Sequence, residues 1–138
     1  MILGTGIDIV AVKRIKEAEI RWGQRFLNRI FTKGELKYSF NHKSPHIHLA
    51  ARFASKEAMM KALGTGLSRG IRWKDVEVVN KDSGKPEIIL HGKAKDLAES
   101  MGIRGVHISI AHDEDYAVAQ VMVEGALKGI GGRGMRCT

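Results

Sequence analysis

The chain has little that could cross-link it or anchor it in a membrane. Its 138 residues include a single cysteine, Cys137, so no internal disulfide can form. No apolar run reaches about 18 residues, which excludes a membrane-spanning helix. The first residues, Met1–Gly6, also lack the basic leader of a signal peptide. We therefore expect a cytoplasmic protein of one domain, built on the 43% of its residues that are hydrophobic.

Acidic residues are the minority charge. Lysine and arginine number 23 against 15 aspartate and glutamate residues, which gives a net charge of +8. A surface of this kind attracts polyanions. Nucleic acid, an acidic protein and a phosphorylated cofactor all satisfy that description, and charge alone leaves the three open.

The apolar pattern predicts an α+β domain over residues 1–124, with a mostly antiparallel sheet and a long helix packed on it. The expected helices are 12–30 with a break near Gly23, 33–41, 45–63 and 92–101. The expected strands are 2–11, which should be buried, 76–79, 88–90, 107–111 and 116–123. The glycine-rich stretch 125–138 is expected to be a flexible tail without a catalytic role.

A carboxylate interrupts the first predicted strand. Asp8 lies among apolar residues and, by the period of two, shares a face with Gly4 and Gly6, where another backbone could approach closely. A buried carboxylate must be paired or bound to a cation, because an isolated buried charge is very costly. A salt bridge, a helix cap and a metal site remain open for Asp8.

Two more charged residues lie on the long predicted helix. Glu57 and Lys61 are four residues apart and share a face, as an ordinary surface ion pair would. Their stripe is otherwise apolar, which places them nearer the sheet than the solvent. If Glu57 and Asp8 supply oxygen ligands together, a hard cation such as Mg²⁺ is the expected partner, and no histidine has a zinc-like spacing.

A glycine loop follows directly. Gly64, Thr65 and Gly66 could cradle phosphate with their backbone N–H groups or simply cap the helix. The spacing matches no established phosphate-binding motif, so the sequence leaves both interpretations open.

Six segments together resemble one family. They are Gly6–Val10, Arg52–Ala58, Lys61–Gly66, Trp73–Val78, Ser83–Pro86 and His107–His112. In this order the chain is similar, over about residues 1–124, to the holo-[acyl-carrier-protein] synthases, the small bacterial type of 4′-phosphopantetheinyl transferase.

The resemblance implies a reaction and a site. Members of the family transfer the 4′-phosphopantetheine arm of coenzyme A to a serine of apo acyl carrier protein, release adenosine 3′,5′-bisphosphate and support fatty acid biosynthesis. It implies that Asp8 and Glu57 bind Mg²⁺ and act in catalysis together with Lys61. The implied coenzyme A contacts are Lys61, Gly64, Thr65, Gly66, Ser83, Gly84, Lys85, Pro86, His107, Ser109 and His112.

The resemblance also implies partners. The family forms homotrimers with the site between subunits, and the acidic acyl carrier protein docks on a basic helix, here through Arg14, Arg21 and Arg25. No nucleic acid or membrane is expected. One departure is Ala111, where the family usually has Ser or Thr. A nucleic-acid-binding module and a non-catalytic coenzyme A binder remain as alternatives, and so do Glu57 and a water oriented by Asp8 as acceptors of the serine proton.

Overall fold

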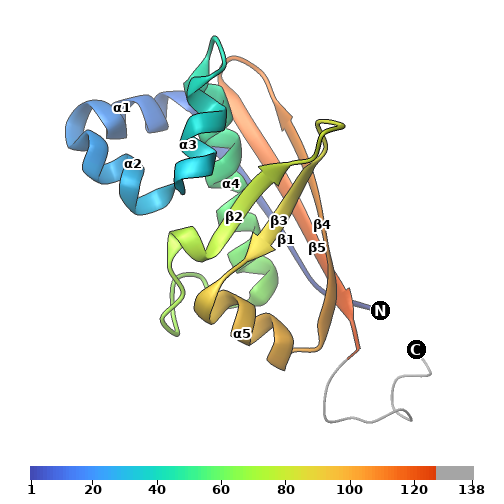
Figure 1. Ribbon diagram of the computed structural model, residues 1–138. Coiled ribbons are helices and arrows are strands. Elements are labelled where there is room, and N and C mark those ends of the chain that lie inside the picture. Colours follow the sequence, from blue (N-terminus) through green and yellow to red (C-terminus); the bar gives the residue numbers. More distant parts are fainter. Residues whose placement is uncertain (127–138) are drawn as a thin grey trace.

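The computed structural model describes residues 1–126 and arranges them as a sheet crossed by one long helix, with smaller elements around it (Figure 1). The helices are α1 (Val12–Trp22), α2 (Gln24–Ile30), α3 (Lys33–Phe40), α4 (Pro45–Leu63) and α5 (Gly92–Ser100), with a 3₁₀ turn η1 (Trp73–Asp75). The strands are β1 (Ile2–Ala11), β2 (Val76–Asn80), β3 (Pro86–Leu90), β4 (Ile103–His112) and β5 (Tyr116–Gly125).

The strands form two antiparallel sheets. One has the order β1-β5-β4, and the other is the β2–β3 hairpin. Figure 1 shows α4 lying along one face of the three-stranded sheet, with the hairpin on its other flank. The predicted α+β class, the antiparallel pairing and the long packed helix are all confirmed.

Two glycines bring α4 unusually close to β1. A Cβ atom on Gly4 would collide with the carbonyl oxygen of Ala62, and one on Gly6 would collide with the carbonyl oxygen of Ala58. Only a residue without a side chain fits such a contact between backbones. The close approach predicted for this face of β1 is confirmed, and the neighbour is the long helix itself.

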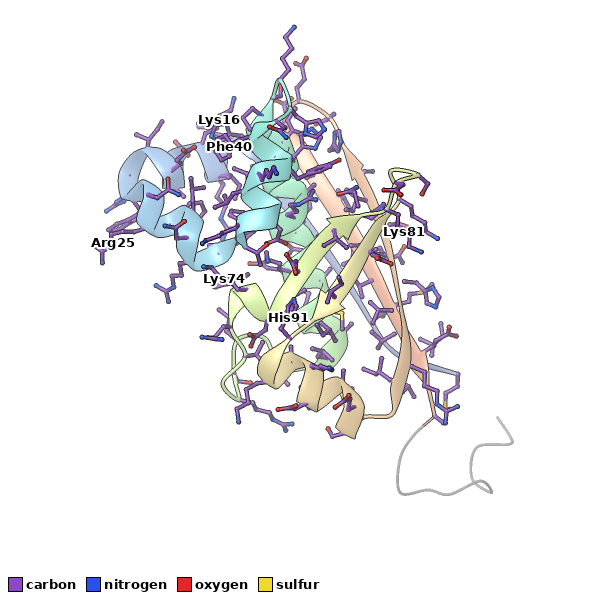
Figure 2. The ribbon with its side chains drawn as sticks, in the orientation of Figure 1. Lys16, Arg25, Phe40, Lys74, Lys81 and His91 are labelled. Atoms are coloured by element: carbon purple, nitrogen blue, oxygen red, sulfur yellow. The ribbon has the colours of Figure 1, made fainter. Side chains whose placement is uncertain are left out.

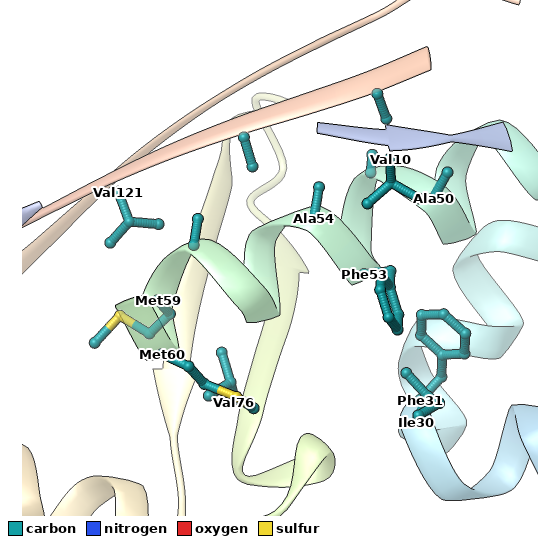
Figure 3. Close-up of a cluster of buried hydrophobic side chains, with 14 of the residues drawn as sticks. Val10, Ile30, Phe31, Ala50, Phe53, Ala54, Met59, Met60, Val76 and Val121 are labelled. Atoms are coloured by element: carbon teal, nitrogen blue, oxygen red, sulfur yellow. The ribbon is translucent and has the colours of Figure 1, made fainter. Parts of the chain in front are cut away.

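The core lies between α4 and its neighbours. Small residues of α4 such as Ala50 and Ala54 face the sheet, with Val10 beside Ala50, while Phe53 points away toward Ile30 of α2 (Figure 3). Burying these apolar side chains contributes about 25 cal/mol for each Å² removed from water. The row of alanines makes α4 thin on its sheet side, so charged residues beside that row lie close to the strands.

Local signals set the boundaries of the helices. Gly23 separates α1 from α2 with a φ of 61°, and Pro45 occupies the first turn of α4, as predicted. The capping box is also present: Thr32 accepts from the Glu35 N–H at 3.2 Å, and Glu35 accepts from the Thr32 N–H at 2.8 Å.

Glu35 has a second role that its sequence position does not indicate. Its carboxylate is buried, lies 2.8 Å from the Lys56 ammonium and accepts from the Val78 N–H at 2.8 Å. The Lys56 Nζ also donates to the backbone oxygens of Trp73 and Val76. One buried ion pair therefore joins α3, α4, η1 and β2.

Some predictions need correction. Strand β1 is not buried on both faces: Ile7 and Ile9 are each 60% exposed, because α4 covers only the face that carries Gly6 and Asp8. Strand β4 begins at Ile103 rather than at residue 107, and β5 extends to Gly125, whose N–H donates to the Met1 carbonyl. The predicted flexible tail otherwise falls on residues 127–138, outside the described residues. Among the helices of residues 1–126, none is both long and apolar enough to cross a membrane.

Candidate active site

The two predicted metal ligands meet where α4 crosses β1. Glu57 of α4 lies close enough to Asp8 of β1 for the Asp8 carboxyl to shift the pKa of Glu57, so carboxylates far apart in sequence become neighbours. The Lys61 Nζ, one turn further along α4, lies 3.2 Å from Asp8 Oδ1 and donates to the Ile7 carbonyl at 2.9 Å. We call Asp8 and Glu57 the carboxylate pair.

The two carboxyl groups of the pair repel each other when both are ionised. Partial burial, followed by the hydrogen bond to Asp8 and its charge, raises the pKa of Glu57 to about 6. The cations Arg14 and Lys61 act in the opposite direction but do not restore the ordinary pKa of Glu57. Two acidic groups held together in this way are short of positive charge.

One oxygen of the pair lacks a partner. Asp8 Oδ2 is buried and has no hydrogen-bond partner among the described residues. Such an atom is costly unless it binds something, and two carboxylate oxygens form a hard donor set that suits Mg²⁺. The residues present therefore fit a hard divalent cation.

A second feature is a cleft of about 400 Å³ between α4, the β2–β3 hairpin and β4, which we call the basic cleft. It is lined by Tyr38, His48, Ala51, Arg52, Asn80, Gly84, Pro86, Ile108, Ser109, Ile110 and His112. Four of these were predicted to contact coenzyme A: Gly84, Pro86, Ser109 and His112. The other two residues of that turn, Ser83 and Lys85, hydrogen-bond to each other at 3.4 Å, from the Lys85 N–H to Ser83 Oγ.

Arg52 forms the floor of the basic cleft. Its side chain is buried, its guanidinium lies 4.1 Å from the centroid of the Tyr38 ring, and its Nη2 donates to Asn80 Oδ1 at 2.6 Å. Burial lowers the pKa of Arg52, although the group stays charged at neutral pH. Its Nε is buried and has no partner within the described part of the chain. A buried cation with a spare donor suits an anionic ligand.

The carboxylate pair and the basic cleft lie on opposite sides of α4. His48 precedes Glu57, and Arg52 precedes Lys61, by about two and a half turns at 3.6 residues per turn. None of Asp8, Glu57 and Lys61 is among the residues that line the basic cleft. The structure thus separates Asp8, Glu57 and Lys61 from the predicted site residues that line the basic cleft.

Other predicted contacts lie elsewhere. Gly64 is the left-handed C-cap of α4, and the N–H groups of Gly64 and Thr65 donate to carbonyls of its last turn, so two of the three amides offered for phosphate are already used. His107 pairs with Glu124 at 2.7 Å on an exposed part of β4, outside the basic cleft.

The three docking arginines do not form one stripe. Arg14 lies 5.2 Å from the centroid of the Phe53 ring, toward the carboxylate pair, and Arg21 stacks on Trp22. Beyond the break at Gly23, Arg25 projects outward from α2 (Figure 2). Arg25 lines a groove of about 390 Å³ with Trp22, Phe26, Arg29, Ile30 and Trp73.

Sequence reasoning missed Arg52 and His48 as site residues. Arg52 stood inside one of the resembling segments, but nothing local indicated that its side chain would be buried beside a strand edge. A basic residue nine positions before Lys61, and so on the opposite helix face, was the one available signal.

Comparison with known proteins identifies the family. The model of the 4′-phosphopantetheinyl transferase superfamily matches residues 4–121. The chain belongs to this superfamily. Among its phosphopantetheinyl transferase relatives, the holo-[acyl-carrier-protein] synthase of Koribacter versatilis is 49% identical over 124 residues, which cover 90% of this chain and 99% of the relative.

Solved structures of phosphopantetheinyl transferases agree with this. The holo-[acyl-carrier-protein] synthase of Neisseria meningitidis matches with a TM-score of 0.82 and 38% identity, over 90% of this chain and 99% of that one. The Helicobacter pylori synthase, solved in complex with coenzyme A, matches with a TM-score of 0.77 and 30% identity, over 87% of this chain and 99% of that one. The family and fold expected from the sequence are confirmed.

Proposed function

We propose that this chain transfers the 4′-phosphopantetheine arm of coenzyme A to a serine of apo acyl carrier protein and releases adenosine 3′,5′-bisphosphate. Its product would serve fatty acid biosynthesis. The observation that carries the proposal is the carboxylate pair with its unpartnered Asp8 oxygen, in a chain 49% identical to a holo-[acyl-carrier-protein] synthase. The family favours this transferase over the nucleic-acid-binding module that charge alone left open.

In this proposal the carboxylate pair holds Mg²⁺. The bound ion would neutralise charge on the phosphates of coenzyme A and favour in-line attack. Lys61 lies beside Asp8, so its ammonium is positioned to contact the same phosphates as a second cation. Glu57 and a water oriented by Asp8 are the two candidates to accept the proton that the carrier serine loses.

The basic cleft is proposed to bind further phosphate of the same donor. The guanidinium of Arg52, whose Nε has no partner among residues 1–126, suits an anion, and Ser109 and His112 line the same cleft. Gly84 and Pro86 close it at the hairpin turn, with Lys85 between them in sequence. We propose that Gly64–Gly66 and His107 also contact coenzyme A, together with residues of another subunit.

Because the two groups lie on opposite sides of α4, we propose that a homotrimer places the carboxylate pair of one subunit against the basic cleft of the next. The uncovered face of the three-stranded sheet supports assembly. Its apolar residues include Ile7, Ile9 and, in register with Ile9, Val118 and Ala111. Ala111, the departure from the family pattern, extends this apolar face.

The proposed reaction is tested by mass. The purified chain is incubated with coenzyme A, Mg²⁺ and an apo acyl carrier protein, and the carrier is weighed. We expect the carrier to gain one phosphopantetheine arm, and chelation of the metal should prevent the gain. A carrier of unchanged mass, with the chain folded and Mg²⁺ present, would exclude the proposal and favour a non-catalytic coenzyme A binder.

Carrier docking is tested separately through Arg21 and Arg25, because Arg14 lies too near Glu57 to report on docking alone. Charge reversal at both positions should raise the KM for the acidic carrier about tenfold and leave the KM for coenzyme A unchanged. Lys95→Glu on the distant α5 is the matched control. Equal effects of the reversals on both substrates would contradict a docking role.

A further inference from the structure

Three imidazoles lie in a row that begins beside the basic cleft, whose lining includes two of them, His48 and His112. The ring centroids of His42 and His48 are 4.1 Å apart, and those of His48 and His112 are 5.7 Å apart. The residues come from the turn before α4, from α4 and from the end of β4, so three segments converge here. We call His42, His48 and His112 the histidine row.

The surroundings of the histidine row are poor in negative charge. Tyr38 of α3 and Arg52 of α4 face the row. Glu35 of α3 and Glu77 of β2 act on Arg52. The exposed Asp113 lies beyond His112. No carboxylate is among the residues that line the basic cleft. Within the lining of the cleft, a proton added to this row would therefore sit beside positive or neutral groups, while the Asp113 carboxylate acts on His112 from outside that lining.

The central ring is accordingly kept neutral. Burial, followed by the charges of His42, His112 and Arg52, lowers the pKa of His48 to about 4. His42 is held in one orientation, since its Nδ1 donates to the Tyr38 carbonyl at 2.7 Å and a carbonyl can only accept. That bond leaves the Nε2 of His42 as the nitrogen that can take a proton.

An anion in the cleft reverses this balance. A phosphate group beside Arg52 would place negative charge next to the row, and opposite charge within about 4–6 Å favours the protonated imidazole. Binding and protonation then assist each other by the same factor, as any two linked equilibria must.

We propose that the histidine row couples phosphate binding in the basic cleft to the uptake of a proton. The affinity for the phosphate-bearing ligand should then rise by about twofold as the pH falls from about 8 to about 7, a range over which the phosphate itself stays mostly dianionic. The inference rests on the proposed function in taking coenzyme A as the source of the phosphate. His48 thereby becomes a binding residue of the cleft, and His42 acts through its contact with His48.

The test is calorimetric and uses the full chain with adenosine 3′,5′-bisphosphate. Titrations at one pH near neutrality, in buffers with different heats of ionisation, give the number of protons taken up on binding. A nearby anion raises an imidazole pKa by about 1–3 units, and the pKa of His48 starts at about 4, so we expect the unmodified chain to take up as much as about half a proton at pH 7. This number should fall toward zero in His48→Gln and decrease in His42→Gln. The slope of log Kd against pH should flatten in both variants.

His91→Gln is the matched control, because His91 pairs with Glu77 and does not line the cleft. It should keep the proton uptake of the unmodified chain, and because the ligand is the same throughout, its own titration cancels. An unchanged proton number in a His48→Gln variant that still binds would overturn the inference alone. Absence of binding by the unmodified chain, together with absence of transfer to carrier, would overturn the proposed function as well.

Discussion

The two sides of α4 collect charges of opposite sign. Toward β1 the helix presents Glu57 beside Asp8, two carboxylates with one unpartnered oxygen. Toward the β2–β3 hairpin it presents Arg52 and His48, a buried cation and a neutral imidazole with no carboxylate in the lining. One side is short of a cation and the other of an anion. A single helix can thus prepare separate places for a metal ion and for phosphate, because residues two and a half turns apart face opposite ways.

The largest expected effect separates the two sides by kinetics. Asp8→Asn or Glu57→Gln should lower kcat at least about 100-fold, because the metal that stabilises the transition state would be lost. Arg52→Gln should chiefly raise the KM for coenzyme A, by about tenfold or more, because it removes binding in the ground state and transition state alike. Steady-state transfer assays measure both.

Circular dichroism and melting temperature provide the control for these three variants. The carboxylate variants should melt no lower than the unmodified chain, because each relieves repulsion within the pair. Full turnover by either of them would refute the metal assignment. A fall in kcat with unchanged KM in Arg52→Gln would show that Arg52 acts in the chemical step, as the carboxylate pair does, and not in binding alone.

The next largest effect concerns the buried ion pair of Lys56 and Glu35. Lys56 lies on α4 between its two sides and is fully buried against Glu35. Lys56→Met should reduce the free energy of unfolding by about 3–5 kcal/mol, because it leaves a buried carboxylate uncompensated. Lys61→Met is the matched lysine on the same helix. Its side chain is 55% exposed, so its ion pair with Asp8 should be worth less than about 1 kcal/mol.

Urea unfolding of both lysine variants gives these free energies. If Lys56→Met proved no more costly than Lys61→Met, the buried pair would not be a structural tie. Restoration of stability in a double variant that also replaces Glu35 should be incomplete, because Glu35 also accepts from Thr32 and Val78.

A smaller effect should damage one side and spare the other. Gly6→Ala would drive a methyl group into the carbonyl of Ala58 and push β1 away from α4. We expect a loss of about 1–3 kcal/mol in stability, together with weaker Mg²⁺ binding, because Asp8 moves with the strand. Binding of adenosine 3′,5′-bisphosphate to the basic cleft should change little.

Gly34→Ala is the control for Gly6→Ala. It lies in α3, where an added Cβ has no neighbour nearer than 3.5 Å, so alanine should be neutral or slightly stabilising. Metal affinity by titration calorimetry and stability by urea unfolding distinguish the cases. A Gly6→Ala variant with normal metal affinity would show that the close contact does not position Asp8.

The smallest effect is a pH dependence of the carboxylate side. The pKa of Glu57 is raised to about 6, so the folded chain binds this proton more readily than the unfolded chain does. In a chelator, the contribution of Glu57 to stability should therefore increase as the pH falls from about 7 to about 5, by about 1 kcal/mol after allowance for solvent screening. Glu57→Gln or saturating Mg²⁺ should abolish this increase in melting experiments. An increase that survives both would have another origin.

The sequence predicted those parts of the fold that local residues decide. Gly23, Thr32 with Glu35, and Pro45 each act within a few residues of themselves, and each begins or ends a helix as expected. The faces of β1 were harder to assign. Apolar residues occupy both faces, so alternation could not indicate that α4 would cover Gly6 and leave Ile7 exposed.

The site divided in the same way. Periodicity placed Asp8 with the glycines and Glu57 with Lys61, but only the family resemblance joined the two carboxylates. Arg52 and His48 were missed, because their cleft is closed by Gly84 and His112, which are distant in sequence. The spacing of residues along a helix indicates which side of the helix they face, but not which distant segment packs against that side.

Alternate residues of strand β1 belong to two different surfaces, the carboxylate pair and the uncovered face of the sheet. Asp8 faces inward to Glu57, whereas Ile7 and Ile9 face outward from the uncovered sheet. A second subunit packed against those isoleucines would restrict the motion of the strand that carries Asp8. Turnover would then depend on association of the chain with its own copies. If the proposed homotrimer forms, dilution that dissociates it should lower the turnover of each chain.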